Sequence, residues 1–131
     1  MNNYEKEVEQ RWGKTAAYKE HTEKTANYTK EKWEEINNGL NTIFIKFARC
    51  KKCGHIASSQ ETQAVVTELQ NYITKYYYTC TNEILAGLGQ MYIGDERFKE
   101  NIDKNGVGTA EFVSEAIRIY CKEKAAMTKR S

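Results

Sequence analysis

The chain has 131 residues, a formal net charge of +2, 40% hydrophobic residues and 29% charged residues. This length and composition are ordinary for a soluble globular protein and predict a single domain. The 20 basic and 18 acidic residues are mixed along the chain, which excludes the basic stripe typical of nucleic-acid-binding domains.

The first 28 residues are compatible with helix, but their apolar side chains are few and widely spaced. From Lys30 onward, apolar residues recur at spacings of three and four, the period of an amphipathic helix. Thr29 precedes this segment and is a suitable N-cap. The apolar stripe consists of Trp33, Ile36, Leu40, Ile43 and Phe47.

A second helix is predicted after a loop near residues 51–58. Ser58 and Glu61 have the spacing of a capping box, which indicates that this helix begins at Ser58. The helix is expected to continue to about Thr79. Its apolar positions are Val65, Val66, Leu69, Ile73 and Tyr77.

A third helix is expected to begin near Thr81 and to end at Gly94, because glycine commonly terminates helices. One side of this helix carries Ile84, Leu85, Leu88, Met91 and Tyr92. Asp95 is a suitable cap for a short helix that follows it and contains Phe98 and Ile102.

The segment NGVGT predicts a turn, and Thr109 is expected to start the last helix. The core face of that helix is Phe112, Val113, Ala116, Ile117 and Tyr120. No stretch of the sequence alternates between apolar and polar residues with the period of a strand. The sequence therefore predicts an all-α domain.

The segment YYYTCTNEILAGLG combines three consecutive tyrosines with two glycines inside an expected helix. On a helical wheel one arc of about 140° holds Leu69, Tyr72, Ile73, Tyr76, Tyr77 and Cys80. Tyr78 lies nearly opposite. This stripe is compatible with a core face and with a cleft in which the phenols bond to ligand or water. Gly87 and Gly89 would permit the close approach of another helix or of a ligand.

No catalytic set is recognisable in the sequence. His21 and His55 lie in polar surroundings, and the chain has no GxSxG, P-loop or HExxH motif. We therefore predict a binding protein without a cofactor rather than an enzyme.

Two alternative functions remain open at this point. The segment CKKCGH could belong to a metal or redox sensor, although Cys50, Cys53 and His55 supply at most three of the four ligands of a structural zinc site. The helices could instead form a protein–protein interaction or dimerisation face with the aromatic side chains as anchors.

The amino terminus lacks the apolar core of a signal peptide. The longest apolar stretch, around residues 43–48, is interrupted by Lys46 and is too short to span a bilayer. We therefore expect a cytoplasmic protein with no membrane partner, whose four cysteines are mostly reduced.

Two long segments of the sequence resemble a known family. They are EVEQRWGKTAAYKEHTEKTANYTKEKW (Glu7–Trp33) and YYYTCTNEILAGLGQMYIGDERFKENID (Tyr76–Asp103). Their RWG-T-AY, YTKE-W and LG-MY--DERF---ID blocks are together highly specific. From about Glu7 to Lys122, the chain resembles the TipA-S-type antibiotic-recognition domain, the effector domain of a branch of the MerR transcription regulators.

The resemblance implies a globin-like helical fold without haem and a deep cleft for large, apolar, ring-rich antibiotics such as thiopeptides. It also implies a lightly tethered N-terminal segment that closes over the ligand. We therefore expect a mobile helical lid at residues 1–28 and a ligand-binding core at residues 29–131. A DNA-binding domain and a coiled coil precede this domain in full-length regulators, so it should not itself contact nucleic acid.

The resemblance and the tyrosine stripe together place the expected cleft between residues 72–80 and residues 88–92, with Trp12 and Tyr18 as a roof. The expected ligand-binding residues are Trp12, Tyr18, Tyr28, Trp33, Tyr72, Tyr76, Tyr77, Cys80, Gly87, Leu88, Met91 and Tyr92. Some thiopeptide-binding members carry, at the place of Gly87, a cysteine that adds to a dehydroalanine of the antibiotic. Since Cys80 points into an apolar stripe, we expect non-covalent binding here.

Overall fold

The computed structural model describes residues 16–130, and it describes the side chains of residues 19–20 and 22–124. No strand occurs in this range, so the prediction of an all-α fold is confirmed. The helices are α2 (Ala16–Thr25), α3 (Lys30–Lys52), α4 (Gln60–Tyr76), α5 (Asn82–Gly94), α6 (Glu96–Asp103) and α7 (Thr109–Arg130). None of the helices in the described part is long and apolar enough to cross a membrane.

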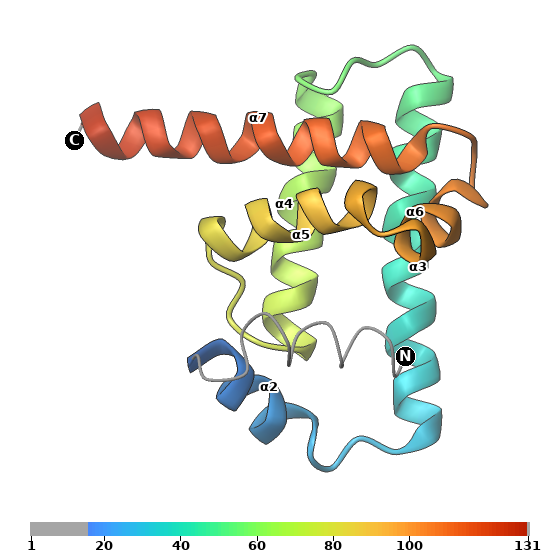
Figure 1. The fold of residues 1–131 in the computed structure, drawn as a ribbon, viewed down its shortest axis with the longest axis vertical. Helices are drawn as coiled ribbons and strands as arrows, with labels where there is room; N and C mark the ends of the chain where they lie inside the picture. Colours follow the sequence, from blue (N-terminus) through green and yellow to red (C-terminus); the bar gives the residue numbers. More distant parts are fainter. Residues whose placement is uncertain (1–15, 131) are drawn as a thin grey trace.

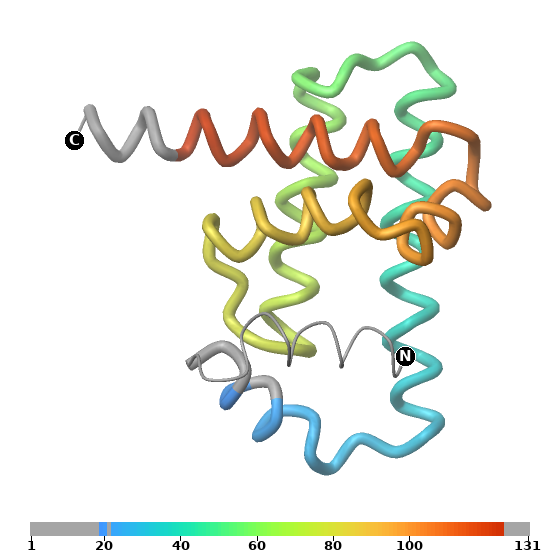
Figure 2. Tube along the Cα trace, in the orientation of Figure 1, coloured from blue at the N-terminus to red at the C-terminus, as the bar shows by residue number. Residues whose placement is uncertain are grey.

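The two long helices α3 and α4 run antiparallel, and α5 and α7 cross them (Figures 1 and 2). α5 packs mainly against α7, and α7 also contacts α3, α4 and α6. The short helix α6 connects α5 to the turn before α7. α2 lies near the carboxyl end of α4 (Figure 1), where the Lys24 ammonium donates a hydrogen bond to the Thr74 carbonyl.

The core forms where these helices meet, and the predicted apolar stripes supply most of it. The fully buried side chains include Ile36, Ile43, Phe47, Leu69, Ile73, Leu85, Leu88, Met91 and Ile117. Trp33 and Leu40 belong to the same predicted stripe of α3 but are only partly buried. These two residues are therefore the exposed part of an otherwise buried helix face.

Two of the predicted helix caps are confirmed. The Thr29 hydroxyl accepts a hydrogen bond from the Lys32 amide at 3.1 Å, and the Asp95 carboxylate accepts one from the Arg97 amide at 2.9 Å. Thr81, near which the third helix was expected to begin, caps α5 in the same way. The prediction for α4 was wrong by one residue, because Ser59 and not Ser58 is the cap and accepts from the Thr62 amide.

The predicted end of α4 was also wrong. The helix ends at Tyr76, because the Tyr77 and Tyr78 amides both donate to the Ile73 carbonyl, at 2.8 and 3.1 Å, and the chain then turns away. This turn reverses the wheel assignment of Tyr78, which is fully buried instead of lying opposite the stripe. Cys80 consequently belongs to the α4–α5 connection rather than to a helical stripe.

Candidate functional site

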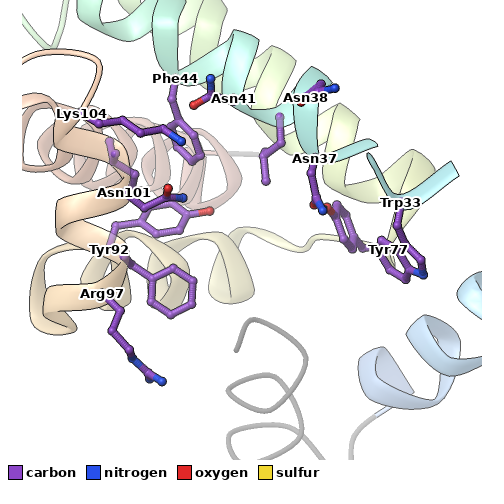
Figure 3. A pocket seen from close by; sticks show the side chains of 13 residues that line it. Trp33, Asn37, Asn38, Asn41, Phe44, Tyr77, Tyr92, Arg97, Asn101 and Lys104 are labelled. Carbon is purple, nitrogen blue, oxygen red and sulfur yellow. The ribbon is translucent and has the colours of Figure 1, made fainter. Parts of the chain in front are cut away.

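A cavity of about 510 Å³ lies between α3, α5 and α6 and extends to the end of α4 (Figure 3). Its volume is within the range of about 300–1,000 Å³ that small-molecule sites occupy. The described residues that line it are Trp33, Asn37, Asn38, Leu40, Asn41, Phe44, Tyr77, Tyr92, Arg97, Phe98, Asn101, Ile102 and Lys104.

One wall of the cavity is a single face of α3. Trp33, Asn37, Leu40, Asn41 and Phe44 follow one another at helical spacing and therefore project to the same side. Aromatic rings stand at the two ends of this row, and asparagine side chains stand between them. The face therefore offers apolar surface and hydrogen-bonding groups to the same ligand.

Aromatic side chains form the two ends of the cavity (Figure 3). At one end the Trp33 and Tyr77 ring centroids are 5.9 Å apart. At the other end Tyr92 contacts Phe44 edge-to-face at 5.5 Å and lies 6.3 Å from Phe98. Aromatic pairs at these distances hold one another in fixed orientations, so the two ends are preformed surfaces for a flat ring.

Tyr77 brings a polar group to the first of these ends. Its side chain is buried, and its hydroxyl donates a hydrogen bond to Asn37 Oδ1 at 3.4 Å. Burial, followed by the neighbouring Tyr72 and Tyr28 phenols, raises the pKa of Tyr77 well above its ordinary value. The phenol therefore stays neutral and remains a hydrogen-bond donor at physiological pH.

Two of the predicted tyrosines lie away from this cavity. The Tyr72 hydroxyl donates to the Ile36 carbonyl at 2.7 Å, and its ring lies 4.8 Å from that of Tyr76. Burial raises the pKa of Tyr72 to about 12. The Lys32 and Lys75 ammonium groups lie over the Tyr76 ring at 5.4 and 5.1 Å. This pair therefore joins α4 to α3 without bordering the cavity.

The close approach of Tyr72 to α3 depends on Gly39. A Cβ atom at Gly39 would overlap the Tyr72 hydroxyl and lie 2.9 Å from Cζ of the same ring. The sequence predicted a close approach only at Gly87 and Gly89, and Gly39 was missed.

Two of the four α5 residues predicted for the site belong to the interior of the bundle without bordering the cavity. Leu88 and Met91 are buried in the core, and a Cβ atom at Gly89 would lie 3.1 Å from Ile117 Cγ2 on α7. Gly89 therefore serves close helix packing, which was one of its two predicted roles. Gly87 is partly exposed and does not border the cavity.

The remaining predicted residues lie at the N-terminal side. Tyr28 packs edge-to-face on Trp33 with ring centroids 5.2 Å apart, and its hydroxyl donates to the Tyr76 carbonyl at 2.8 Å. Tyr28 therefore packs against the Trp33 side chain and helps to hold it in place. Trp12 lies outside the described residues, as does the side chain of Tyr18.

The cysteines show no arrangement for metal binding. Within the described part of the chain, no group of three or more His, Cys, Asp or Glu side chains could hold a metal ion. His55 Nδ1 instead lies 3.7 Å from Glu61 Oε2. Cys80 is buried, and burial followed by the neighbouring Cys121 raises its pKa to about 12.

The sequence reading placed Trp33, Tyr77 and Tyr92 in the site, and the structure brings these three to one cavity. It missed the polar lining, which comprises Asn37, Asn38, Asn41, Arg97, Asn101 and Lys104. One signal was available in α3, where Asn37 and Asn41 lie on the face that also carries Trp33, Leu40 and Phe44. Polar residues within an apolar stripe often mark a solvent-accessible or functional part of a helix.

Comparisons with known proteins agree with this architecture. The family model of the TipAS antibiotic-recognition domain matches residues 4–120. The chain is similar to the HTH-type transcriptional activator TipA of Streptomyces coelicolor, with 37% identity over 88% of this chain and 46% of TipA. It is also similar to the HTH-type transcriptional activator mta of Bacillus subtilis, with 40% identity over 92% of this chain and 46% of mta.

A solved structure of similar fold comes from a thiopeptide antibiotic multidrug resistance system of Streptomyces lividans and is described as nosiheptide in complex with TipAS. The two chains superpose with a TM-score of 0.80 at 35% sequence identity, over 94% of this chain and 86% of the other. The present chain spans about half the length of the curated relatives it matches.

Proposed function

Because the chain belongs to the TipAS antibiotic-recognition domain family, we propose that it binds large, ring-rich peptide antibiotics of the thiopeptide class. The proposed site is the cavity between α3, α5 and α6. The observation that carries this proposal is the combination of aromatic ends with a row of carboxamides along α3. The protein then acts by binding rather than by catalysis, and within a longer chain it would sense the antibiotic for a transcription activator.

The lining fits the chemistry of a peptide antibiotic that contains heteroaromatic rings. Flat rings stack against aromatic side chains and displace water from them, which favours binding at the Trp33 end and at the Tyr92 end. Each asparagine side chain offers a carbonyl acceptor and an NH₂ donor, so it can pair with the amide groups that link such rings. Asn38 and Asn101 are exposed and accessible for this purpose.

Binding is proposed to be non-covalent. A thiol adds to a dehydroalanine as its thiolate, and the raised pKa of Cys80 keeps it protonated. Cys80 is also only 4% exposed. Position 87, where some members carry a reactive cysteine, is glycine in this chain.

Nosiheptide is the ligand for a direct test by calorimetric titration of the full chain. We expect the wild-type protein to bind it, and Trp33→Leu to weaken binding by about tenfold or more, because a stacking surface is removed. Phe112→Leu is the matched control, since Phe112 is a partly buried aromatic residue of α7 that does not border the cavity. Absence of binding by the wild-type chain would reject the proposed function.

The same complex also shows whether binding is covalent. Intact mass spectrometry should recover the unmodified protein mass after nosiheptide is removed under denaturing conditions. Equal affinity of Trp33→Leu and wild type for nosiheptide would show that the antibiotic binds outside this cavity. A stoichiometric adduct at Cys80 would contradict non-covalent binding.

We propose further that residues 1–28 act as the closing segment over a core of residues 29–131. What supports this is the attachment of α2, whose described side chains make polar contacts with the end of α4 and the residues that follow it. Glu20 accepts hydrogen bonds from the amide and the hydroxyl of Thr79, both at 2.8 Å, and the Thr79 amide bond is the largest cause of its lowered pKa. Lys24 bonds to the Thr74 carbonyl.

An element that is attached through partly exposed polar groups has a small free energy of local opening. The backbone amides of α2 should therefore exchange with solvent faster than those of α3 in the free protein and become protected when nosiheptide is bound. Hydrogen-exchange mass spectrometry measures both states, with the α7 amides of residues 110–120 as the internal reference. Protection of α2 that is the same with and without a saturating ligand would reject the closing segment.

A further inference from the structure

We propose that the α6 end of the cavity is an anion-binding subsite, which takes an acidic group attached to the ring system of the ligand. This inference rests on the proposed function, because it assigns a ligand feature to the same cavity. The donor groups are Lys104, Asn41 and Asn101, which lie around the Phe44 and Tyr92 end of the cavity (Figure 3). Trp33 and Tyr77 occupy the opposite end.

Lys104 supplies the positive charge of this subsite. It directly follows α6, where its backbone amide donates to the carbonyls of Glu100 and Ile102. Its ammonium has no hydrogen bond or ion pair with any residue that the structure describes, although Glu100 and Asp103 are close in sequence. The Asp103 carboxylate is engaged elsewhere, because Oδ1 accepts from the Ala110 amide at 2.8 Å.

The other cation at the cavity is neutralised within the protein. Arg97 Nη2 lies 2.7 Å from Asp95 Oδ2, and Arg97 Nε donates to Asp95 Oδ1 at 3.1 Å. The hydrogen bond from this guanidinium is the largest cause that lowers the pKa of Asp95 to about 2. The pair is therefore ionised at neutral pH. Lys104 is the cation of the described lining that forms no ion pair with a described carboxylate, although Glu96, Glu100 and Asp103 border a neighbouring groove with it.

Asn41 borders the same region and can act there as a donor. Its Oδ1 already accepts a hydrogen bond from Asn105 Nδ2 at 3.1 Å. One lone pair of this carbonyl is thus used within the protein, and the NH₂ group of the side chain is available as a donor to a ligand. An ammonium and an amide donor on adjacent walls can both donate to the oxygens of an anion. A cationic group would find no acceptor in this pair.

The rest of the lining agrees with this polarity. None of the described residues that border the cavity is an aspartate or a glutamate. An anion at this end would meet no like charge from the walls, whereas a cationic ligand would face Lys104 without compensation. The aromatic rings of Phe44, Tyr92 and Phe98 next to the donors would hold the ring that carries the acidic group.

Lys104 and Asn101 are exposed, so the attraction is screened by water and salt. The preference for an anion should therefore be moderate and should decrease as ionic strength rises. We expect about a tenfold gain in affinity at low ionic strength, in the range of one charge-assisted hydrogen bond.

Two fluorescent probes with the same rings test the inference directly. They are 1-anilinonaphthalene-8-sulfonate, which carries an anionic group, and N-phenyl-1-naphthylamine, which lacks it. Each is titrated into the full chain at low ionic strength and then displaced with nosiheptide to verify the site. The variants are Lys104→Met and the matched control Lys99→Met, since Lys99 lies on α6, outside the cavity, paired with Glu111 at 3.6 Å.

We expect wild type and Lys99→Met to bind the sulfonate about tenfold more tightly than the neutral probe. Lys104→Met should reduce this ratio to about twofold and leave the affinity for the neutral probe unchanged. If both probes are displaced by nosiheptide but Lys104→Met keeps the wild-type ratio, the anion subsite is rejected while the proposed function stands. If nosiheptide binds but displaces neither probe, the assignment of this cavity is rejected and the subsite with it.

Discussion

Replacing Gly89 with leucine is expected to destabilise the protein by about 3 kcal/mol or more, because overpacking of a tight core forces side chains and backbone apart. The α5 backbone lies directly against α7 at this point. Even a Cβ atom would lie 3.1 Å from Cγ2 and 3.3 Å from Cβ of Ile117. Ile117 is β-branched and 1% exposed, so its side chain has few other rotamers and little space into which it could move.

Chemical denaturation of Gly89→Leu and wild type measures this free energy. Gly94→Ala is the matched control on the same helix, since a Cβ atom there has nothing within 4 Å. It should be neutral or stabilising by up to about 1 kcal/mol, because alanine favours helix over glycine. If Gly89→Leu is as stable as the wild type, the helices can separate freely at this contact, and the close-packing role assigned to Gly89 is wrong.

A helix of this protein could be predicted well where its apolar stripe agrees with a cap. In α3, the spacing of Ile36, Ile43 and Phe47 defines the buried face, and Thr29 marks where the helix begins. A hydroxyl cap and a periodic stripe act within a few residues, so both can be read without knowledge of tertiary structure.

The end of α4 could not be predicted in the same way, since no glycine or proline follows the three tyrosines. The helix stops at Tyr76 because distant groups stabilise the turn that follows. The Tyr76 carbonyl accepts from the Tyr28 hydroxyl, and Glu20 of α2 accepts from the Thr79 amide. Tertiary contacts of this kind override local helix propensity.

This helix end explains why only part of the site could be predicted. With a helix through Thr79, the wheel placed Tyr72, Tyr76 and Tyr77 on one face. In the structure the turn places Tyr77 at the cavity, whereas Tyr72 and Tyr76 pack beside α3. The contributions of α6 depend on how that short helix packs against α5 and α7, for which the sequence holds no local signal. The roles in binding of all the predicted residues remain proposals.

Gln70 is a polar residue of α4 that connects this helix to the start of α5 and to α7. Its Nε2 donates to the Cys80 carbonyl at 2.8 Å and to Asn82 Oδ1 at 2.9 Å. Its Oε1 accepts from the Tyr120 hydroxyl at 2.8 Å. Cys80 and Tyr120 are 4% and 7% exposed, so water can hardly replace Gln70 as their partner.

Gln70→Leu should therefore lower the free energy of unfolding by about 2–3 kcal/mol, because it keeps the volume of the side chain and leaves buried partners unsatisfied. Tyr120→Phe removes one of the three hydrogen bonds and should cost about 1 kcal/mol. The double variant should lose less stability than the sum of the two single variants, since the shared hydrogen bond can be lost only once.

Urea denaturation of the four proteins gives these free energies of unfolding. Gln90→Leu, at an exposed position of α5, controls for the change in polarity. A loss below about 0.5 kcal/mol for Gln70→Leu, the range of ordinary surface substitutions, would show that these hydrogen bonds do not hold α5 in place.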